Sequence, residues 1–297
     1  MVKRPGADGQ RKMDVLALQD QDWFRIEDTY EQVMCHKLEL IRSCRDLVYA
    51  ASPAAGRGAQ EAFELASQYL TQRFSHRFGM SDGELIDLHT GRRARVGEGD
   101  SAPLLSLASI VDEDLVVMEL DNAGRYRVSA VCACCPSHWS IHQKLGKTLQ
   151  EVHEPVPNLN SNIGAQIDQL VDRLPTNRAV ARINMLVNFD PRWSQFPALI
   201  ESSPFPHTDL ERSSIGDLLY LRNERETITK LPETRAILFT IKTYQVPFRL
   251  LPGWACEKLA SYHEGFDRGY RVGYRKLSES EHELVVDWLR RRAALSM

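Results

Sequence analysis

The feature that most constrains the fold is a set of β-prone segments, several of them joined by short turns. Their β-branched and aromatic composition predicts five strands, at residues 114–120, 125–134, 179–188, 218–229 and 235–246. The first two are joined by Asp121-Asn122-Ala123-Gly124, a hairpin turn sequence, and the last two by a turn that contains Pro232. Short turns join strands that run in opposite directions, so the sequence predicts a mostly antiparallel sheet.

In the sequence, helical patterns come both before and after the segments predicted as strands. Residues 22–49 read as helix, and the apolar residues between Ala62 and Leu70 repeat at the spacing of one buried helical face. Near the C-terminus, Ser278 and Glu281 form a capping box ahead of a periodic apolar segment. We therefore expect an α+β protein in which N- and C-terminal helices flank the sheet.

No convincing linker divides the chain. Residues 1–12 are polar and basic and are expected to form a flexible tail, which leaves 13–297 as a single domain. Within it we expect a helical part at 13–105, a sheet core at 106–250 and C-terminal helices at 251–297.

Charge and hydropathy exclude several kinds of partner. The formal net charge is -3 and the pI is near 6.3, so the chain has no excess of positive charge for nucleic acid or an anionic membrane. Its apolar runs are far shorter than a membrane span, and the first residues lack the apolar stretch of a secretory signal. These features predict a cytoplasmic protein that acts on a small molecule or on another protein.

The cysteines and histidines permit a zinc hypothesis that the spacing disfavours. Cys132, Cys135, His138 and His142 supply zinc-binding atoms, but only two residues separate the cysteine pair from the histidine pair, against about twelve in a zinc finger. Buried structural thiols are the better interpretation. Without a secretory signal, the six cysteines do not predict a disulfide framework.

The segment from Trp139 to Pro157 contains the residue that draws most interest. His153 is followed by Glu154-Pro155-Val156-Pro157, and the two prolines are expected to fix an extended backbone directly after the histidine. A rigidly held imidazole suits a metal ligand, but it equally suits a structural turn.

Several motifs in this order resemble the alpha subunit of haem-dependent oxidative N-demethylase, a haem-binding PAS-like enzyme. The matching stretches are Pro136-Ser137-His138-Trp139, Lys144-Leu145-Gly146-Lys147, Val152 to Pro157, Arg182-Ile183-Asn184, Leu221 to Pro232 and Phe239 to Tyr244. Weaker similarity reaches back to the Asp22-Trp23 helix, so the resemblance covers most of the chain from about residue 15.

The resemblance implies an enzyme and its cofactor. It implies a PAS-like sheet that binds haem b through iron, and a monooxygenase reaction in which O2 and electrons oxidise the carbon beside an amine nitrogen. The chain has no recognisable flavin, nicotinamide or iron–sulfur motif. Electrons would therefore come from a separate reductase subunit or protein.

The resemblance also implies a set of site residues. The expected iron ligand is His153, with His142 as the alternative, and the other expected cofactor-binding residues are Trp139, Lys144 and Arg182. The expected catalytic residues are Glu224, Arg225 and Tyr244.

Strand alternation leaves the roles of these residues open. It places Glu224 and Glu226 on one face of their strand and Arg225 on the other, so only one set can face the haem. Arg182 and Arg225 could bind haem propionates, or they could form internal ion pairs with neighbouring glutamates. Tyr244 could equally be a core aromatic residue.

Two departures from the family pattern bear on the substrate. Met185 and Glu226 stand where the family has Trp and Gln, so the identity of the amine stays open. Two functions of other classes also remain: a PAS-like haem sensor of gas or redox state, and a relative that has lost haem and serves as a scaffold.

Overall fold

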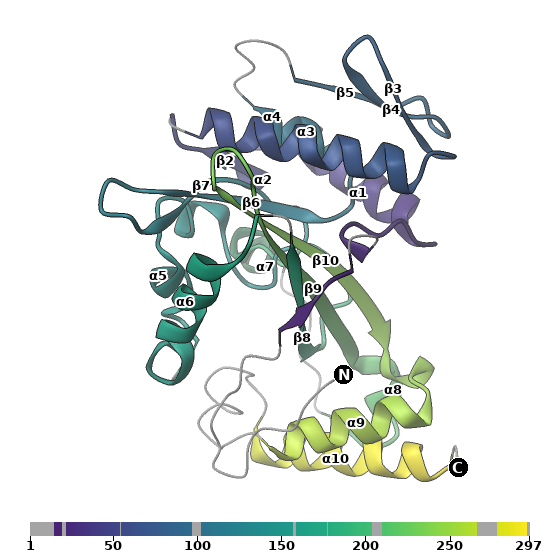
Figure 1. Ribbon diagram of the computed structural model, residues 1–297. Coiled ribbons are helices and arrows are strands. Elements are labelled where there is room, and N and C mark those ends of the chain that lie inside the picture. Colours follow the sequence, from purple (N-terminus) through teal and green to yellow (C-terminus); the bar gives the residue numbers. More distant parts are fainter. Residues whose placement is uncertain are drawn as a thin grey trace.

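The structure is a computed structural model, and its fold is built around one large sheet (Figure 1). It describes residues 15–19, 22–53, 55–96, 102–156, 159–176, 178–203, 210–265 and 278–295. The expected flexible tail at 1–12 lies outside the described residues.

The large sheet has seven strands in the order β1-β8-β9-β10-β6-β7-β2, and every neighbouring pair is antiparallel. The strands are β1 (Leu16–Ala17), β2 (Tyr49–Ala51), β6 (Asp114–Leu120), β7 (Tyr126–Cys132), β8 (Ala179–Asn188), β9 (Tyr220–Lys230) and β10 (Ile237–Pro247). All five predicted strands are therefore present, and both predicted hairpins pair as expected.

The N-terminal part contains less helix than the sequence predicted. Helix α1 (Tyr30–Ser43) begins eight residues later than expected, and the segment from Asp22 to Thr29 before it is not α-helical. Three further helices follow: α2 (Arg45–Val48), α3 (Gly56–Arg73) and α4 (Pro103–Ala108). This part also contains a three-stranded sheet of β3 (Phe78–Ser81), β4 (Glu84–Asp87) and β5 (Arg93–Arg95).

These N-terminal elements cover one face of the large sheet. Met34, Ala62 and Leu70 of α1 and α3 belong to the same buried cluster as Leu115 and Leu238 of β6 and β10. Burial of this apolar surface is what attaches the N-terminal part to the sheet.

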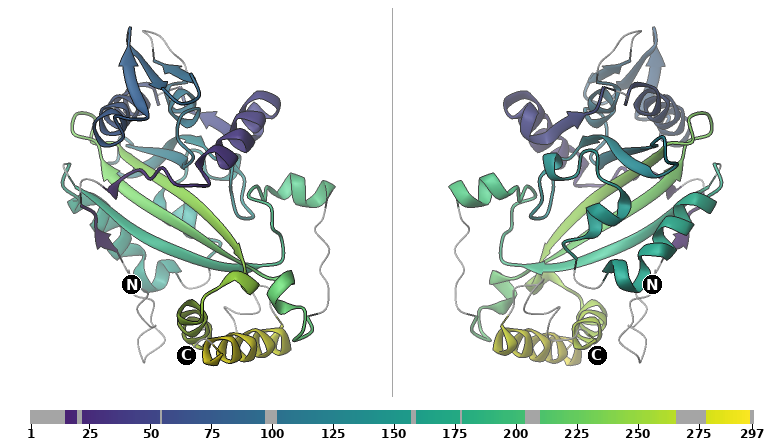
Figure 2. Two further views of the ribbon diagram at one scale, coloured as in Figure 1. Left: turned by 90° about the vertical axis from the view of Figure 1, so that its right-hand side faces the viewer. Right: turned by 90° about the vertical axis from the view of Figure 1, so that its left-hand side faces the viewer.

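A group of short helices between β7 and β8 packs on the opposite face. It comprises the 3-10 helix η2 (Ile141–Gln143), α5 (Leu149–His153), the π-helix η3 (Asn160–Gly164) and α6 (Ala165–Arg173). Ile141 and Val171 share a buried cluster with Val131 and Ile237 of the sheet. Figure 2 shows α5 and α6 beside the sheet, away from the N-terminal helices.

The C-terminal helices cover one end of the sheet. α8 (Ile215–Leu218), the 3-10 helix η4 (Phe248–Leu250), α9 (Gly253–Glu264) and α10 (Glu279–Ala294) share a cluster with Leu221 of β9. The predicted capping box is confirmed, because Ser278 and Glu281 each accept the other's backbone N–H at the start of α10. The remaining helix, α7 (Pro197–Ser202), precedes β9. None of the helices described is both long and apolar enough to cross a membrane.

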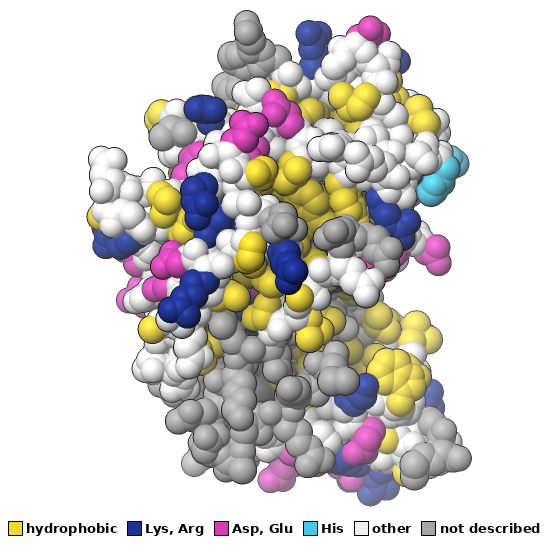
Figure 3. All heavy atoms as spheres, in the orientation of Figure 1, with side chains coloured by type: hydrophobic (Ala, Val, Ile, Leu, Met, Phe, Trp, Pro, Cys, Tyr) yellow, Lys and Arg dark blue, Asp and Glu magenta, His cyan; other side chains and the backbone are white. Residues whose placement is uncertain are grey.

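The surface also carries apolar side chains. Figure 3 shows hydrophobic side chains gathered in a hollow near the middle of the face seen in Figure 1. Exposed apolar residues include Leu16 of β1 and Ile183 of β8, both more than half exposed.

Buried cations bound to main-chain carbonyls connect the layers. Lys37, Lys230 and Lys242 are almost fully buried, yet each donates to a carbonyl of a distant segment, at Val111, Asp172 and Arg25 respectively, over 2.7–2.8 Å. Arg225 does the same with the carbonyls of Trp23 and Asp22. Satisfied in this way, a buried cation adds directed contacts to segments that also bury apolar side chains such as Phe24 and Val111.

The Lys242–Asp112 ion pair offers a test of this packing. Its Nζ and Oδ2 atoms are 2.6 Å apart, and both side chains are at most 2% exposed. Lys242→Met should lower the free energy of unfolding by about 3–5 kcal/mol, because it leaves a buried carboxylate without its cation. Urea denaturation measures the change. The matched control is Arg249→Met, which removes an exposed pair with Asp217 and should cost less than about 1 kcal/mol.

Candidate functional site

Five of the seven predicted site residues lie together on the face of the sheet that α5 covers. Residues directly opposite in antiparallel strands project from the same face. Arg182 lies opposite Glu226, and Asn184 lies opposite Glu224. This face therefore carries Arg182 and Asn184 of β8 with Glu224 and Glu226 of β9, and His153 lies above it.

Helix α5 determines the position of His153. It begins at a capping box in which Thr148 and Glu151 bind each other's backbone N–H groups. Arg127 of β7 lies 3.3 Å from Glu151 and holds this end of the helix against the sheet. His153 is the last helical residue, and Glu154 keeps helical dihedral angles. The expected extended backbone directly after the histidine was therefore wrong, because the capped helix continues through that position.

The environment of His153 keeps its imidazole neutral. Burial lowers the pKa of His153 to about 4, and the positive charge of Arg182 adds to the effect. Its Nδ1 atom is buried and makes no hydrogen bond, although the carbonyl of Leu149, one turn earlier, favours the protonated ring. A neutral imidazole has the protonation state that a metal ligand requires.

Lys144 and Trp139 lie beside the same helix. The Nζ of Lys144 donates to the carbonyl of Val152 over 2.7 Å, and burial lowers the pKa of this lysine. The charge of Lys144 also acts on His153. Trp139, like Val152 and Ile228, packs against the buried cluster that includes Val131 and Ile141. The two residues give the imidazole one cationic neighbour and an apolar surrounding.

The two glutamates of β9 have different partners. Glu224 accepts hydrogen bonds from Arg222 Nε over 2.9 Å and from Asn184 Nδ2 over 3.1 Å. Glu226 Oε2 lies 3.1 Å from Arg182 Nε. Burial raises the pKa of Glu226, and the nearby charge of Glu224 raises it further, whereas Arg182 opposes both.

Arg225 and Tyr244 lie on the other face of the sheet. Arg225 alternates with Glu224 along β9, and its guanidinium donates to the carbonyls of Asp22 and Trp23. Tyr244 donates to Glu27 Oε2 over 2.7 Å, and burial raises the pKa of this tyrosine. The structure thus does not bring the three predicted catalytic residues together. Arg225 and Tyr244 hold the segment before α1, and Glu224 shares the face of His153.

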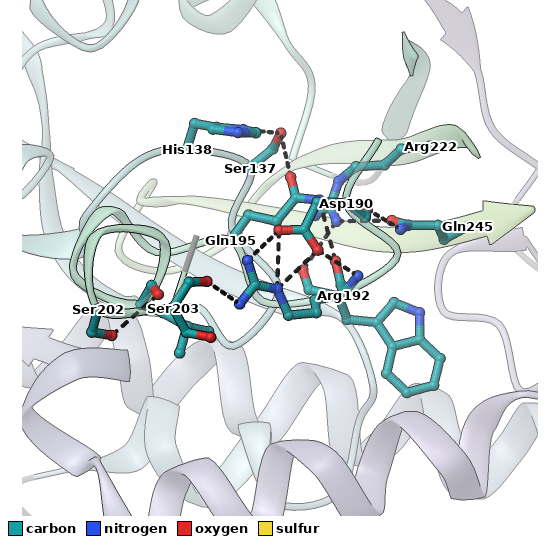
Figure 4. A network of polar contacts seen from close by, with 11 residues as sticks. Ser137, His138, Asp190, Arg192, Gln195, Ser202, Ser203, Arg222 and Gln245 are labelled. Carbon is teal, nitrogen blue, oxygen red and sulfur yellow. Dashed lines mark hydrogen bonds and ion pairs between the residues drawn. The ribbon is translucent and has the colours of Figure 1, made fainter. Parts of the chain in front are cut away.

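A polar network that sequence reasoning missed supports one end of this face (Figure 4). Arg222 is fully buried and donates to the carbonyls of Cys135 and Trp193. Gln245 donates to the carbonyl of Asp190 over 2.6 Å, and Gln195 donates to the same carbonyl over 3.1 Å. The only available signal in the sequence was an arginine two residues from Glu224 on one predicted strand.

The same network holds the motif Pro136-Ser137-His138-Trp139, which follows β7. His138 N donates to the carbonyl of Gln195, and Gln195 N donates to the carbonyl of Pro136. His138 has a φ of 63°, which non-glycine residues rarely adopt. Paired backbone segments therefore fix the position of the chain directly before Trp139.

The alternative metal-binding residues have other structural roles. His142 Nε2 is 2.8 Å from the carbonyl of Asp46, and the thiols of Cys132 and Cys135 are buried. Burial and the charge of Asp114 raise the pKa of Cys135, which opposes thiolate formation. Within the described parts of the chain, no group of three or more His, Cys, Asp and Glu residues is arranged to hold a metal ion.

Comparison with known protein families shows the family to which the chain belongs. The family described as haem-dependent oxidative N-demethylase, alpha subunit-like, matches residues 14–285. The chain belongs to this family. The N-demethylase family name describes a haem-dependent oxidoreductase, and the term alpha subunit implies that such a chain works with a partner.

The residues around His153 fit the cofactor in the family name. Haem needs a neutral nitrogen ligand, apolar surroundings and cations near its two carboxylates. His153 offers a neutral imidazole. Arg182 and Lys144 are the nearby cations, and their charges lower the pKa of His153. The sensor and scaffold alternatives have no comparable support in the family name.

The titration of His153 tests this description of the site. In the haem-free protein its imidazole should titrate near pH 4, well below the ordinary value of 6.5, because burial and Arg182 disfavour the cation. Proton–nitrogen NMR between pH 3.5 and 8, with His153→Gln to assign the signals, measures it. Between pH 6.5 and 4 the unfolded state binds more protons, so stability should fall as the pH decreases. A midpoint near 6.5 would contradict the buried neutral imidazole.

Proposed function

We propose that this chain is the haem-binding subunit of a monooxygenase that removes an alkyl group, such as methyl, from the nitrogen of a small amine. The observation that carries the proposal is the partly buried, neutral His153 beside Arg182 and Lys144, in a chain of the N-demethylase family. The products would be the dealkylated amine and an aldehyde.

The proposed cofactor is haem b, held by His153 as the ligand to iron. The sequence has no C-x-x-C-H motif for covalent attachment, which favours a non-covalent haem. Bound haem would supply the O2 activation that no side chain of this chain can supply. Arg182 and Lys144 would bind the haem carboxylates, and Trp139 would pack against the apolar part of the ring.

The order of the strands supports a PAS-like domain as the scaffold. The five central strands run β7-β6-β10-β9-β8, which is 2-1-5-4-3 in chain order, and the helices η2 to α6 are inserted between the second and third. This order supports the PAS-like sheet that the family resemblance implies, with the inserted helices as the ligand-binding part. We propose that residues 13–297 form one such domain with added terminal helices.

Glu224 is the proposed acid–base group for the amine. It lies on the same face as His153, and its two oxygens are oriented by Arg222 and Asn184. A carboxylate held in this way can bind an ammonium group and accept a proton as the substrate is oxidised. Arg225 and Tyr244, proposed from the family resemblance, would act only if substrate or partner reached the other face.

Electrons would come from a separate reductase subunit or protein in the cytoplasm. The chain has no nucleotide-binding motif, and the family name designates an alpha subunit, which supports a second component.

A first prediction concerns the iron ligand. Wild-type protein supplied with ferric haem should develop the Soret band of a histidine-ligated haem, and His153→Ala should lose that spectrum and bind haem at least about tenfold more weakly. The matched control is His142→Ala, which removes the alternative ligand and should keep the wild-type spectrum. Absorbance titration measures all three. A colourless wild type contradicts the proposed function, and an unchanged His153→Ala spectrum contradicts the ligand assignment alone.

A second prediction separates the two faces of the sheet. A small amine should shift the Soret band of the wild-type haem complex if it binds beside the iron, whereas a gas sensor should not respond. Glu224→Gln should weaken the amine-dependent shift by about tenfold, because the carboxylate charge is lost. Tyr244→Phe should leave it unchanged, because its hydroxyl binds Glu27 on the opposite face. The reverse pattern would place the amine on the face of Arg225 and Tyr244.

A further inference from the structure

Two arginine–glutamate ion pairs lie on this face, Arg182–Glu226 and Arg222–Glu224, and the first is more exposed to solvent. The side chains of Arg182 and Glu226 are 32% and 14% exposed, whereas those of Arg222 and Glu224 are 0% and 10% exposed. Arg222 is committed to Glu224 and to two backbone carbonyls. Because its side chain is the more exposed, Arg182 is easier than Arg222 for a ligand on this face to reach.

If an anionic ligand replaced Glu226 as the partner of Arg182, the balance of charges on this face would change. As the structure stands, Arg222 neutralises Glu224 and Arg182 neutralises Glu226. If an anionic group takes the guanidinium of Arg182, Glu226 keeps a negative charge without its cation. That charge would be partly buried and would lie on the same strand and face as Glu224, which costs free energy until a cation arrives.

We propose that Arg182 and Glu226 are exchangeable partners: Glu226 holds the guanidinium until a carboxylate binds Arg182, and Glu226 then binds a cationic ligand, a protonated amine. The inference rests on the proposed function in one respect, that the carboxylate belongs to haem. It makes Glu226 a residue that determines specificity for charged over neutral ligands.

The exchange couples the two ligands. Both ligands favour the broken Arg182–Glu226 pair. The anion should therefore strengthen binding of the cation, and the cation should strengthen binding of the anion by the same factor. Arg182 also acts on His153, so the exchange takes place beside the imidazole that we assign to iron. Cofactor and amine would thus bind in a cooperative order without any movement of the sheet.

The experiment uses the full chain and the isosteric variant Glu226→Gln. Removing the competing carboxylate should make haem bind on the order of tenfold more tightly, and should weaken the Soret response to dimethylammonium by a similar factor. Isopropanol, a neutral molecule of similar size, should bind the two proteins equally. The matched control is Glu84→Gln, which removes a cross-strand Glu–Arg pair in the distant three-stranded sheet and should change neither affinity.

A second measurement does not need haem. In the haem-free wild type, sodium propionate should strengthen binding of dimethylammonium, followed by tryptophan fluorescence, and Glu226→Gln should abolish that effect. This measurement tests the exchange of partners even if Glu226→Gln cannot be purified, because the wild type alone must bind dimethylammonium more tightly in propionate.

The outcomes separate the exchange from the proposed function. Wild type that binds no haem contradicts the function, while propionate-dependent amine binding would still support the exchange. Wild type that binds haem, with Glu226→Gln unchanged toward both haem and dimethylammonium, overturns the exchange and leaves the function standing. Absence of the propionate effect in wild type also overturns it.

Discussion

The buried guanidinium of Arg222 is the interaction on which the candidate site depends. It joins the segment after β7, the loop before α7 and two adjacent strands, because its donors reach Cys135, Trp193, Glu224 and Gln245. A guanidinium presents five donors in one plane, so it can fix several segments at once where a lysine could fix fewer. Removing water from this charge is tolerable only because all of these acceptors are in place.

The alternation of side chains along β9 places its glutamates and Arg225 on opposite faces of the sheet. Glu224 and Glu226 face α5 and His153, whereas Arg225 faces the segment before α1. One strand therefore supplies carboxylates to the site on one side and an anchor for the N-terminal segment on the other. A change of register by one residue would exchange these two roles completely.

Sequence reasoning recovered the five central strands of the sheet but not the edge strands β1 and β2, because strand composition and short turns act locally. Strands β6 and β8 begin and end where the pattern predicted. The helix predicted from residue 22 failed because Arg225 and Lys242, two hundred residues later, bind the carbonyls of Asp22, Trp23 and Arg25. Such distant contacts leave no trace in local periodicity.

The site residues remain predictions, and their surroundings could not be predicted for a similar reason. His153 was identified from the family resemblance, and its neutral state follows from burial that no local pattern encodes. The alternation rule predicted that Glu224 and Arg225 would separate, but it did not tell which face carried His153. That information comes from the packing of α5, which Arg127 and the capping box of Thr148 hold in place.

The buried lysines have a consequence for the tolerance of this sequence to mutation. Lys37, Lys230 and Lys242 bind main-chain carbonyls, which every amino acid provides. Asp172 and Arg25 could therefore be replaced by many residues without loss of these contacts, whereas the lysines that bind them could not. Related chains can thus diverge widely in the segments that are held while retaining the cations that hold them.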